Sequence, residues 1–335
     1  MKLSVEALRQ LGLEVFLAAG VPGETATCVV DALVLAELDG MPSHGFSRIP
    51  FYADQALSGK VNRTARPTTL RAAPAMVRVD ACNGFAFPAI DAGLAETIPL
   101  AREYGVAAFG VTRSHHCGVA GHHVEHAARA GLLALAFSNT PSAMAPWGGS
   151  RAVFGTNPIA FGCPRGEVDP LIVDLSLSKV ARGKIMNAKQ RGESIPEGWA
   201  LDAEGRPATD PAAALAGTMI PLGDAKGAAL ALMVEILAAT LTGSRHAYEA
   251  SSFFEAEGPA PGIGQFFMLI DPLALNADFT ARVEALCAAM LDQPGVRLPG
   301  ARRFALRERR REEGVELPDA LYATLRARTA GGGRR

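Results

Sequence analysis

The feature that most constrains the fold is a series of short apolar runs, each of a length that suits a β-strand. Helices fit between the first runs, at about 87–104 and 119–131, but residues 140–170 offer only Pro- and Gly-rich connections and one more apolar run. A purely parallel sheet needs a crossover between neighbouring strands, so we predict an α/β protein with a mixed, largely antiparallel sheet. The runs cover residues 76–82, 106–111, 132–139, 154–162, 171–176 and 266–272.

Apolar residues at helical spacing mark both ends of the chain. Residues 5–19 place most of theirs along one side, and Ser4 and Gly20 suit the cap and the end of that helix. Further helices are expected over residues 22–38, 49–58 and 228–241. We expect a helical domain made of residues 1–75 with 276–330, a mixed-sheet domain of residues 76–275, and a disordered tail at 331–335.

The charge balance argues against a nucleic-acid-binding or membrane-surface protein. The 335 residues include 33 Lys and Arg against 34 Asp and Glu, so no excess charge is available to hold a polyanion. The Arg-rich stretch at 302–313 also contains glutamates at helical spacing. We interpret this stretch as a solvated helix face.

The cysteines and the apolar runs indicate the compartment. The five cysteines are widely spaced and form no C-x-x-C, which argues against a disulfide framework or a structural zinc site. No apolar run reaches the roughly 18 residues that a membrane span needs. We therefore expect a soluble, cytoplasmic protein with reduced thiols.

Four common motifs are absent. The sequence has no G-x-G-x-x-G after a strand, no G-x-x-x-x-G-K-[ST], no G-x-S-x-G and no H-E-x-x-H. The classical dinucleotide fingerprint, the P-loop, the hydrolase nucleophile elbow and the zincin site therefore lack support.

The first candidate site is Ser43-His44-Gly45 with Arg48, directly after an expected helix. A histidine near its ordinary pKa can exchange a proton, and a guanidinium can bind a carboxylate through two parallel hydrogen bonds. Such a pair suits a small 2-oxo or 2-imino acid. The same short motif also fits a loop histidine that only bonds backbone, so other motifs must support it.

A second candidate is a cluster of histidines, because five of the seven lie within twelve positions. His122 and His126 are four residues apart and would share a helix face, as metal ligands often do. A metal-dependent hydrolase or lyase that uses the His115–His126 cluster is therefore the alternative function. No acidic or cysteine ligand has a matching spacing, so we expect no metal and place His122, His123 and His126 on a helix surface along a polar cleft.

Three further segments combine glycine or small hydroxyls with polar groups. Thr156 and Asn157 follow a glycine and can hydrogen-bond a ligand. The strand end at 173–179 offers hydroxyls and a cation for ribose and phosphates. Lys226-Gly227 opens a helix whose N-terminus favours an anion. Ordinary turns, a strand edge and a helix cap would also explain these residues.

Taken in order, these motifs resemble the type II malate/L-lactate dehydrogenase family over nearly the whole chain. The eight blocks are S-H-G-x-x-R (43–48), R-S-H-H-x-G-x-A-G (113–121), S-N (138–139), F-G-T-N-P-I-A-F (154–161), V-D-L-S-x-S (173–178), G-W-A-L-D with T-D-P (198–202, 209–211), P-L-G-x-x-K-G (221–227) and L-P-G-x-R-R (298–303). The resemblance implies a homodimeric NAD(P)-dependent oxidoreductase with a non-Rossmann cofactor-binding sheet. Its substrate would be a small 2-oxo, 2-hydroxy or cyclic 2-imino acid. Residues 77–88 and 247–254 look closest to the piperideine-2-carboxylate/pyrroline-2-carboxylate reductase and sulfolactate dehydrogenase branches.

The resemblance also implies roles for individual residues. His44 matches the family's proton donor, whereas His116 matches a histidine with the acid/base role in some members, so the choice between them stays open. Asp174 is expected to orient the catalytic histidine. The substrate is expected to contact Arg48, Thr156 and Asn157. The residues expected at the cofactor are Ser43, Asp174, Leu175, Ser176, Ser178, Lys179, Arg182, Lys226, Gly227, Pro299, Gly300 and Arg302.

NADP(H) is favoured over NAD(H) as the cofactor. NADPH carries an extra 2′-phosphate, and a site that prefers it needs cations near the adenine ribose. In the family that ribose lies near the strand that ends at Ser178, and Lys179 and Arg182 follow directly. The alternative is that both side chains point to solvent.

Overall fold

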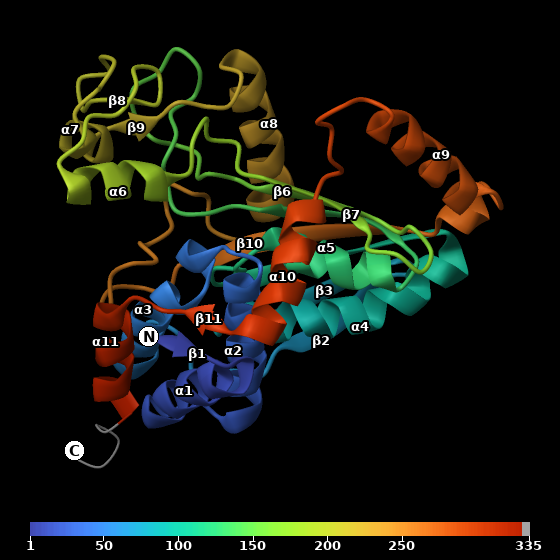
Figure 1. Cartoon of the computed structure of the whole chain (residues 1–335), viewed down its shortest axis with the longest axis horizontal. Coiled ribbons are helices and arrows are strands. Elements are labelled where there is room, and N and C mark those ends of the chain that lie inside the picture. The colour runs from blue at the N-terminus through green and yellow to red at the C-terminus, as the bar shows by residue number, and fades with distance from the viewer. Residues whose placement is uncertain (330–335) are drawn as a thin grey trace.

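A computed structural model describes residues 1–329, so the tail expected at 331–335 lies outside the described residues. Its centre is a seven-stranded sheet with the order β2-β3-β4-β10-β5-β6-β7 (Figure 1). Only β3 and β4 run parallel, and the other neighbours in this sheet are antiparallel. The predicted mixed, largely antiparallel α/β fold is confirmed. The strands are β2 (Thr68–Ala73), β3 (Met76–Asp80), β4 (Val106–Ser114), β5 (Leu133–Ser138), β6 (Ile159–Cys163), β7 (Leu171–Leu175) and β10 (Ile263–Ile270).

β10 lies inside the sheet although it is the last of the seven strands in sequence. It pairs with β4 on one side and with β5 on the other, and most of its residues are buried. Phe267 of β10 stacks on Phe109 of β4 with the ring centroids 4.5 Å apart. A strand covered on both faces has a nearly continuous apolar sequence, which is why the run at 266–272 predicted it.

Helices cover both faces of the sheet. In Figure 1, α4 (Ala86–Tyr104) and α5 (Ala120–Arg129) lie under the sheet and α8 (Ala225–Glu235) lies above it. α4 approaches closely at Gly93, where a Cβ would lie 2.4 Å from the ring of Phe109. α8 continues into a π-helical turn over Ile236–Thr240, so the run predicted as one helix changes its hydrogen-bond register near its end.

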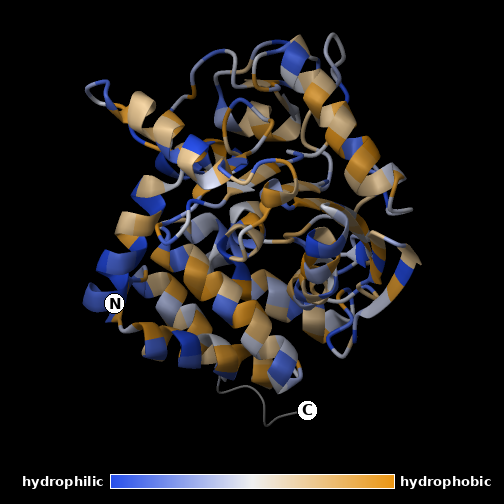
Figure 2. Ribbon diagram, turned by 90° about the vertical axis from the view of Figure 1, so that its right-hand side faces the viewer, coloured by the Kyte–Doolittle hydropathy of each residue, from blue (hydrophilic) through white to orange (hydrophobic). Residues whose placement is uncertain are grey.

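The N-terminal helices form a third layer. α1 (Val5–Ala18), α2 (Gly23–Leu38) and α3 (Ile49–Ser58) bury one apolar side each, and the C-terminal α11 (Asp319–Thr329) packs beside α1. Figure 2 shows polar and apolar residues alternating along these helices. β1 (Lys2–Leu3) pairs with β11 (Val315–Glu316) and so joins the two ends of the chain.

β2 differs from the expected organisation. It falls within residues 1–75, the range expected for the helical domain, but it forms a hairpin with β3 and so extends the sheet. From the other end of the chain, α10 packs on α2. The remaining elements are α6 (Arg182–Arg191), β8 (Ala200–Leu201), α7 (Pro211–Ala216), β9 (Thr218–Met219), α9 (Phe279–Leu291), α10 (Ala301–Glu313) and 3-10 turns at Pro42–His44, Phe46–Arg48 and Pro272–Ala274.

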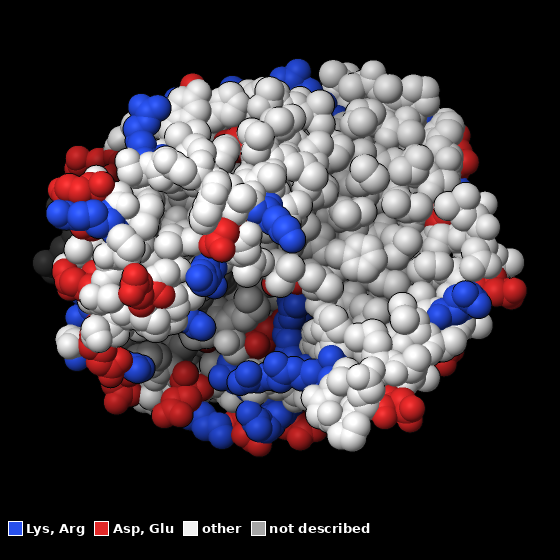
Figure 3. Space-filling view, turned by 90° about the horizontal axis from the view of Figure 1, so that it is seen from above, with Lys and Arg blue, Asp and Glu red and all other residues white. Residues whose placement is uncertain are grey.

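The surface carries charges of both signs. Figure 3 shows acidic and basic side chains interspersed over one face, with several Lys and Arg side chains gathered around a hollow. Among residues 1–329, no helix combines the length and the apolar character needed to cross a membrane. All five cysteines are free thiols.

Candidate active site

Two histidines from distant parts of the chain stack against each other. His44 ends the turn after α2, His116 follows β4, and their ring centroids lie 5.4 Å apart with 28° between the planes. Nδ1 of His44 lies 3.0 Å from Ser43 Oγ. Nδ1 of His116 lies 2.6 Å from Tyr52 Oη. Within residues 1–329 neither Nε2 has a hydrogen-bond partner, so both remain available to a ligand.

The guanidinium of Arg48 lies near this pair and has no acidic partner among residues 1–329. Its Nε donates to the backbone oxygen of Ser43 at 2.6 Å, and its central carbon lies 4.6 Å from the centre of the Phe254 ring. Nη1 is buried and has no hydrogen-bond partner in the described part of the chain. A buried cation without a counterion is unfavourable, so this guanidinium is suited to receive an anion.

Burial keeps both histidines neutral in the unliganded protein. It lowers the pKa of His44 to about 3, and the Arg48 cation acts in the same direction. The pKa of His116 is also lowered well below its ordinary value, first by burial and then by Arg48. An anion bound at Arg48 would offset the positive charge and raise both pKa values. The arrangement therefore couples the binding of an acid to the basicity of the histidines.

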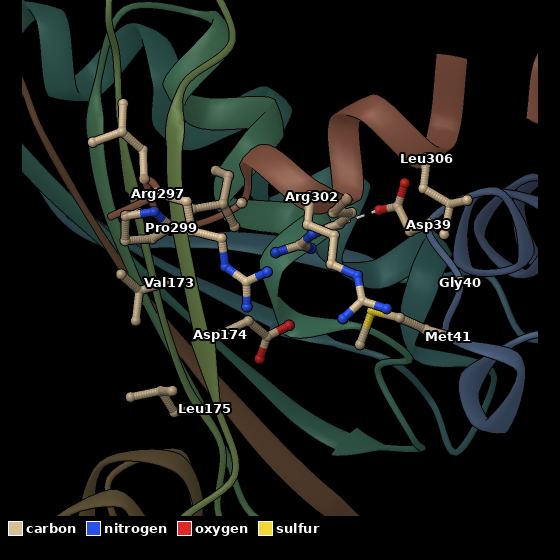
Figure 4. Close-up of a pocket in the computed structure, with 14 residues that line it drawn as sticks. Asp39, Gly40, Met41, Val173, Asp174, Leu175, Arg297, Pro299, Arg302 and Leu306 are labelled. Carbon is tan, nitrogen blue, oxygen red and sulfur yellow. Dashed lines mark ion pairs between the residues drawn. The ribbon is translucent and has the colours of Figure 1, made fainter. Parts of the chain in front are cut away.

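A cavity of about 580 Å³ lies between the end of α2, β7 and the start of α10 (Figure 4). Met41, three residues before His44, contributes to its wall. Five residues expected at the cofactor line this cavity, namely Asp174, Leu175, Pro299, Gly300 and Arg302. In Figure 4, Asp174 and Arg302 extend into it. Arg303 also lines it, and its Nε lies 3.8 Å from Asp39 Oδ2. Its Nη1 is buried and has no hydrogen-bond partner in the described part of the chain, which suits a ligand with anionic groups.

Asp174 does not orient a histidine in this structure, contrary to expectation. Its Oδ2 accepts a hydrogen bond from the backbone N–H of Gly121 at 2.8 Å, at the start of α5. Burial raises the pKa of Asp174. The orienting contact to His116 comes from Tyr52, which sequence reasoning missed. The sequence carried a signal for Tyr52, which lies one helical turn after Arg48. In a helix, side chains at this spacing lie on the same face.

The other residues expected around the ribose lie beyond the end of β7 and do not line the cavity. Ser176 Oγ and Ser178 Oγ are 2.5 Å apart, and Ser178 also donates to a backbone oxygen. Lys179 is exposed, and its backbone N–H donates to Ile220. Arg182 begins α6, and burial lowers its pKa.

Lys226 and Gly227 lie at the start of α8, also outside the cavity. Lys226 is exposed. Gly227 is buried against the loop before the helix, where a Cβ would lie 1.9 Å from the backbone oxygen of Leu222. The glycine is therefore explained by close packing of the loop on the helix.

The two residues expected beside Arg48 at the substrate lie in different surroundings. Asn157 is fully buried, and its amide donates to Glu235 Oε2 at 2.8 Å and to the backbone oxygen of Ala231 at 3.0 Å. Its NH2 group is thus occupied by the protein, whereas its buried Oδ1 has no hydrogen-bond partner within residues 1–329, so the expected contact with a substrate stays a prediction. Thr156 is partly exposed, and its Oγ1 lies 3.4 Å from Thr140 Oγ1.

The histidine cluster separates into individual contacts. His115 Nε2 lies 2.8 Å from Gln55 Oε1, His122 Nε2 lies 2.8 Å from Asp39 Oδ2, and His123 Nε2 lies 2.8 Å from a backbone oxygen. His123 is buried, so its expected position on a helix surface is wrong. Among residues 1–329, no three His, Cys, Asp or Glu side chains are grouped closely enough to hold a metal ion.

A second group of buried charges surrounds Arg307 of α10. This guanidinium contacts Asp39 at 2.6 and 2.9 Å and Glu125 at 2.7 and 2.8 Å. The pKa values of both carboxyls are lowered because the hydrogen bonds from Arg307 and other partners outweigh the effect of burial. The interpretation of 302–313 as a solvated face is therefore wrong at Arg307, because α10 packs this side onto α2 and α5.

Comparisons with known proteins agree with the family resemblance. Residues 3–326 match the family model described as malate/L-lactate dehydrogenase. The chain is 57% identical over 325 residues to the (2R)-3-sulfolactate dehydrogenase (NADP(+)) of Chromohalobacter salexigens, with 97% of each chain covered. It is 39% identical over 331 residues to a Δ1-pyrroline-2-carboxylate reductase of Ancylobacter novellus, covering 98% of this chain and 97% of that one.

Solved structures give the same result. The Δ1-piperideine-2-carboxylate reductase of Pseudomonas syringae superposes with a TM-score of 0.93 at 36% identity, covering 98% of this chain and 99% of that one. The sulfolactate dehydrogenase of Methanocaldococcus jannaschii superposes with a TM-score of 0.91 at 30% identity, covering 99% and 98%.

Proposed function

Because the chain belongs to the malate/L-lactate dehydrogenase family, we propose that it transfers a hydride between NADP(H) and C2 of a small 2-oxo or 2-hydroxy acid. The observation that carries this proposal is the stacked pair of His44 and His116, with free Nε2 atoms, beside the buried guanidinium of Arg48. Reduction at C2 needs a proton for the developing alkoxide and a counterion for the carboxylate. The site offers both.

The first choice of substrate pair is (2R)-3-sulfolactate and 3-sulfopyruvate. This choice rests on the relative that is 57% identical over 97% of the chain. The second candidate is reduction of a cyclic 2-imino acid, supported by the relatives at 39% identity and by the similar reductase structure. Both substrate classes place an oxygen or nitrogen and a carboxylate on the same C2 carbon, so both fit a histidine beside an arginine.

The roles of the residues follow from their contacts. Arg48 binds the substrate carboxylate, and this neutralises the cation that depresses the pKa values of the histidines. His44 gives a proton from Nε2 to the C2 oxygen in reduction and takes it back in oxidation. His116, fixed through Nδ1 by Tyr52, presents Nε2 to the same substrate.

The cofactor is expected in the cavity between α2, β7 and α10. The unpartnered Nη1 of Arg303, with Arg297 and Arg302 in the same wall, suits the phosphates of a dinucleotide. Asp174 and Gly300 would border it. When bound there, the nicotinamide supplies or accepts the hydride.

Preference for NADP(H) rests on the name of the most similar relative cited above. It also rests on two sets of cations, Lys179 with Arg182 beyond β7 and the arginines in the cavity wall. The proposal from sequence places the 2′-phosphate at Lys179 and Arg182. A Lys179→Ala, Arg182→Ala double variant should then lower the ratio of catalytic efficiencies with NADPH and NADH. A matched Arg297→Ala variant tests the cavity arginines. An unchanged ratio in the first variant and a lowered ratio in the second would move the 2′-phosphate to the cavity.

We also propose a cytoplasmic homodimer with a helical part and a sheet part that act as two domains, β2 counted with the sheet. Support for the dimer comes from the apolar side chains that α8 and the π-turn leave exposed, which a second copy would cover. These are Leu230, Leu232, Met233, Ile236 and Leu241. Light scattering after size-exclusion chromatography measures the assembly.

The deciding experiment is a substrate panel. Purified protein with NADPH is offered pyruvate, oxaloacetate, 3-sulfopyruvate, pyrroline-2-carboxylate and piperideine-2-carboxylate, and loss of NADPH absorbance is followed. The highest kcat/KM is expected with 3-sulfopyruvate. A cyclic imine as the best substrate would select the second candidate, and no turnover with any of these acids would contradict the proposal.

A further inference from the structure

The segment 252–257 forms an aromatic wall over the histidine site. Phe253 packs on His116 with the ring centroids 5.1 Å apart and on His115 at 5.2 Å. The next residue, Phe254, covers the guanidinium of Arg48. These two rings therefore limit the space beside the groups that would bind and protonate a substrate, and they keep water from one side of the cation.

This segment belongs to no helix or strand, and the end of α3 holds it by its backbone. Gln55 Nε2 donates to the backbone oxygens of Phe253 and Glu255 at 2.9 and 3.0 Å. Ser58 Oγ donates to that of Ala256 at 2.6 Å. Lys60 Nζ donates to those of Ser252, Glu255 and Glu257 at 2.7, 2.9 and 3.1 Å.

Gly59 allows the turn that brings the donors of Gln55, Ser58 and Lys60 to the same segment. Gly59 has φ of +82° and ends α3 in the left-handed conformation. This turn sends Lys60 back toward the same segment that Gln55 contacts from within the helix.

Lys60 is unusual in its surroundings. Its side chain is buried, and no ion pair joins it to a carboxylate within residues 1–329. All three hydrogen bonds of its ammonium go to backbone oxygens of one six-residue segment. Burying a cation without a counterion costs free energy, and a neutral side chain of similar length would avoid that cost. We therefore explain the charge of Lys60 by its three hydrogen bonds to the 252–257 segment.

We propose that Lys60 is a positioning residue that clamps the 252–257 segment, so that Phe253 and Phe254 form a closed wall and restrict the site to small acids. Within residues 1–329, Lys60 forms no hydrogen bond with His44 or His116, and it acts on the substrate through the two rings. Its cation also lowers the pKa of His115, after the larger effect of burial. The consequence for substrate choice rests on the proposed function, whereas the clamp itself does not.

Lys60→Met tests the clamp, because methionine keeps much of the aliphatic stem and removes the three donors. Without any substrate, backbone amide exchange in residues 252–257 should rise at least about tenfold, and chymotrypsin should cleave after Phe253 or Phe254. Lys189→Met removes an exposed lysine of α6 and serves as the matched control. Unchanged exchange and cleavage in a folded Lys60→Met protein would overturn the proposal.

The kinetic arm measures specificity. In Lys60→Met, kcat/KM for the best small acid of the panel should fall roughly tenfold, mainly through KM, while kcat/KM for the bulkier phenylpyruvate should stay equal or rise. The dissociation constant of NADPH should not change. A loosened segment with an equal loss for both acids would limit Lys60 to a structural role and contradict the proposal.

A milder variant covers the case in which Lys60→Met does not fold. Ser58→Ala removes one hydrogen bond to the segment, to Ala256, together with two local contacts of the same hydroxyl, to the Gln55 oxygen at 3.2 Å and from the Lys60 backbone N–H at 3.3 Å. Because all three Lys60 Nζ donors remain, exchange in the segment should rise by a smaller factor. Exchange equal to that of the unaltered protein would again count against the clamp. Because the exchange arm uses no substrate, an enzyme inactive with the whole panel leaves this test intact.

Discussion

Two groups of buried polar side chains lie near the C-terminal end of α2 and differ in one respect. Around Arg307, the guanidinium contacts two carboxylates through four short hydrogen bonds, and both carboxyl pKa values are lowered. Around Arg48, the guanidinium has a buried unpartnered nitrogen, and two neutral histidines keep free Nε2 atoms.

Buried polar groups therefore serve two purposes in this fold. Where every charge has its partner inside the protein, the group joins α10 to α2 and α5 and contributes to stability when intact. Where partners are missing, the unsatisfied groups cost stability unless a ligand supplies them. The first group should therefore respond to mutation in its unfolding free energy, and the second in its kinetics.

The largest effect is expected at the incomplete site. His44→Gln should lower kcat by roughly a hundred- to ten-thousand-fold and leave NADPH affinity nearly unchanged, because the residue acts on a proton in the transition state. Steady-state kinetics and a cofactor titration measure this. If more than about a third of the turnover survives, the principal acid is His116, and His116→Asn should then show the larger loss.

In the complete group, Arg307→Met should lower the unfolding free energy by about 3–5 kcal/mol, because it leaves two buried carboxylates without their cation. Urea denaturation measures the loss. Arg309→Met, an exposed neighbour on α10, should stay within about 0.5 kcal/mol. A change below about 1 kcal/mol at Arg307 would remove the distinction between the two groups.

Arg48→Lys should weaken apparent substrate affinity by about 1–3 kcal/mol, because the ammonium lacks the planar fork that binds a carboxylate. The unfolding free energy should change little or rise, since no protein carboxylate loses a partner. KM values for substrate and cofactor separate the roles. A raised constant for NADPH with an unchanged substrate KM would assign Arg48 to the cofactor.

The two groups should also affect the stability of the protein in different pH ranges. His44, His115 and His116 are neutral in the fold with lowered pKa values, so the unfolded chain takes up more protons below about pH 6.5 and stability falls from there. Asp39 and Glu125 have lowered carboxyl pKa values and lose their contribution only at more acidic pH, near and below about 4.

A His44→Gln, His116→Asn double variant isolates the histidine contribution. Between about pH 6.5 and 5, the unfolding free energy of this variant should fall less steeply on acidification than that of the unaltered protein. The slopes should differ by up to roughly 1.4 kcal/mol per pH unit for each histidine removed. Burial raises the pKa values of Glu37 and Asp174, so these carboxyls add stability as the pH falls. Both proteins contain them, so their effect cancels when the two slopes are compared. Equal slopes would show that the histidines are not held neutral.

Much of the fold followed from local patterns. The six apolar runs all became strands of the central sheet, and the missing crossover helix in 140–170 predicted its antiparallel part correctly. The order of short motifs identified the family. β2 was not predicted, because Thr68–Ala73 is an exposed edge strand without an apolar face.

The candidate site was predicted in its residue types and less well in its contacts. In the structure His44 stacks on His116 with Arg48 beside them, and Asp174 and the 299–302 segment line one cavity, while their roles stay predictions. Asn157 was assigned to the substrate because nearby glycines let the backbone approach a ligand and its amide offers hydrogen-bonding groups. The structure shows that its NH2 group is bonded to Glu235, 78 residues away.

Local sequence patterns specify which stretches become strands and helices, because alternation and helical spacing of apolar residues are properties of neighbouring positions. The sequence also determined the family through the order of its motifs. Contacts between distant segments, in contrast, pair the buried Arg307 with two carboxylates, leave Arg48 without an acidic partner among residues 1–329, and bring Lys60 to a residue 192 positions away. A periodic pattern of apolar residues indicates which side of an element is buried. It does not indicate which charged side chain from another part of the chain will lie against that side.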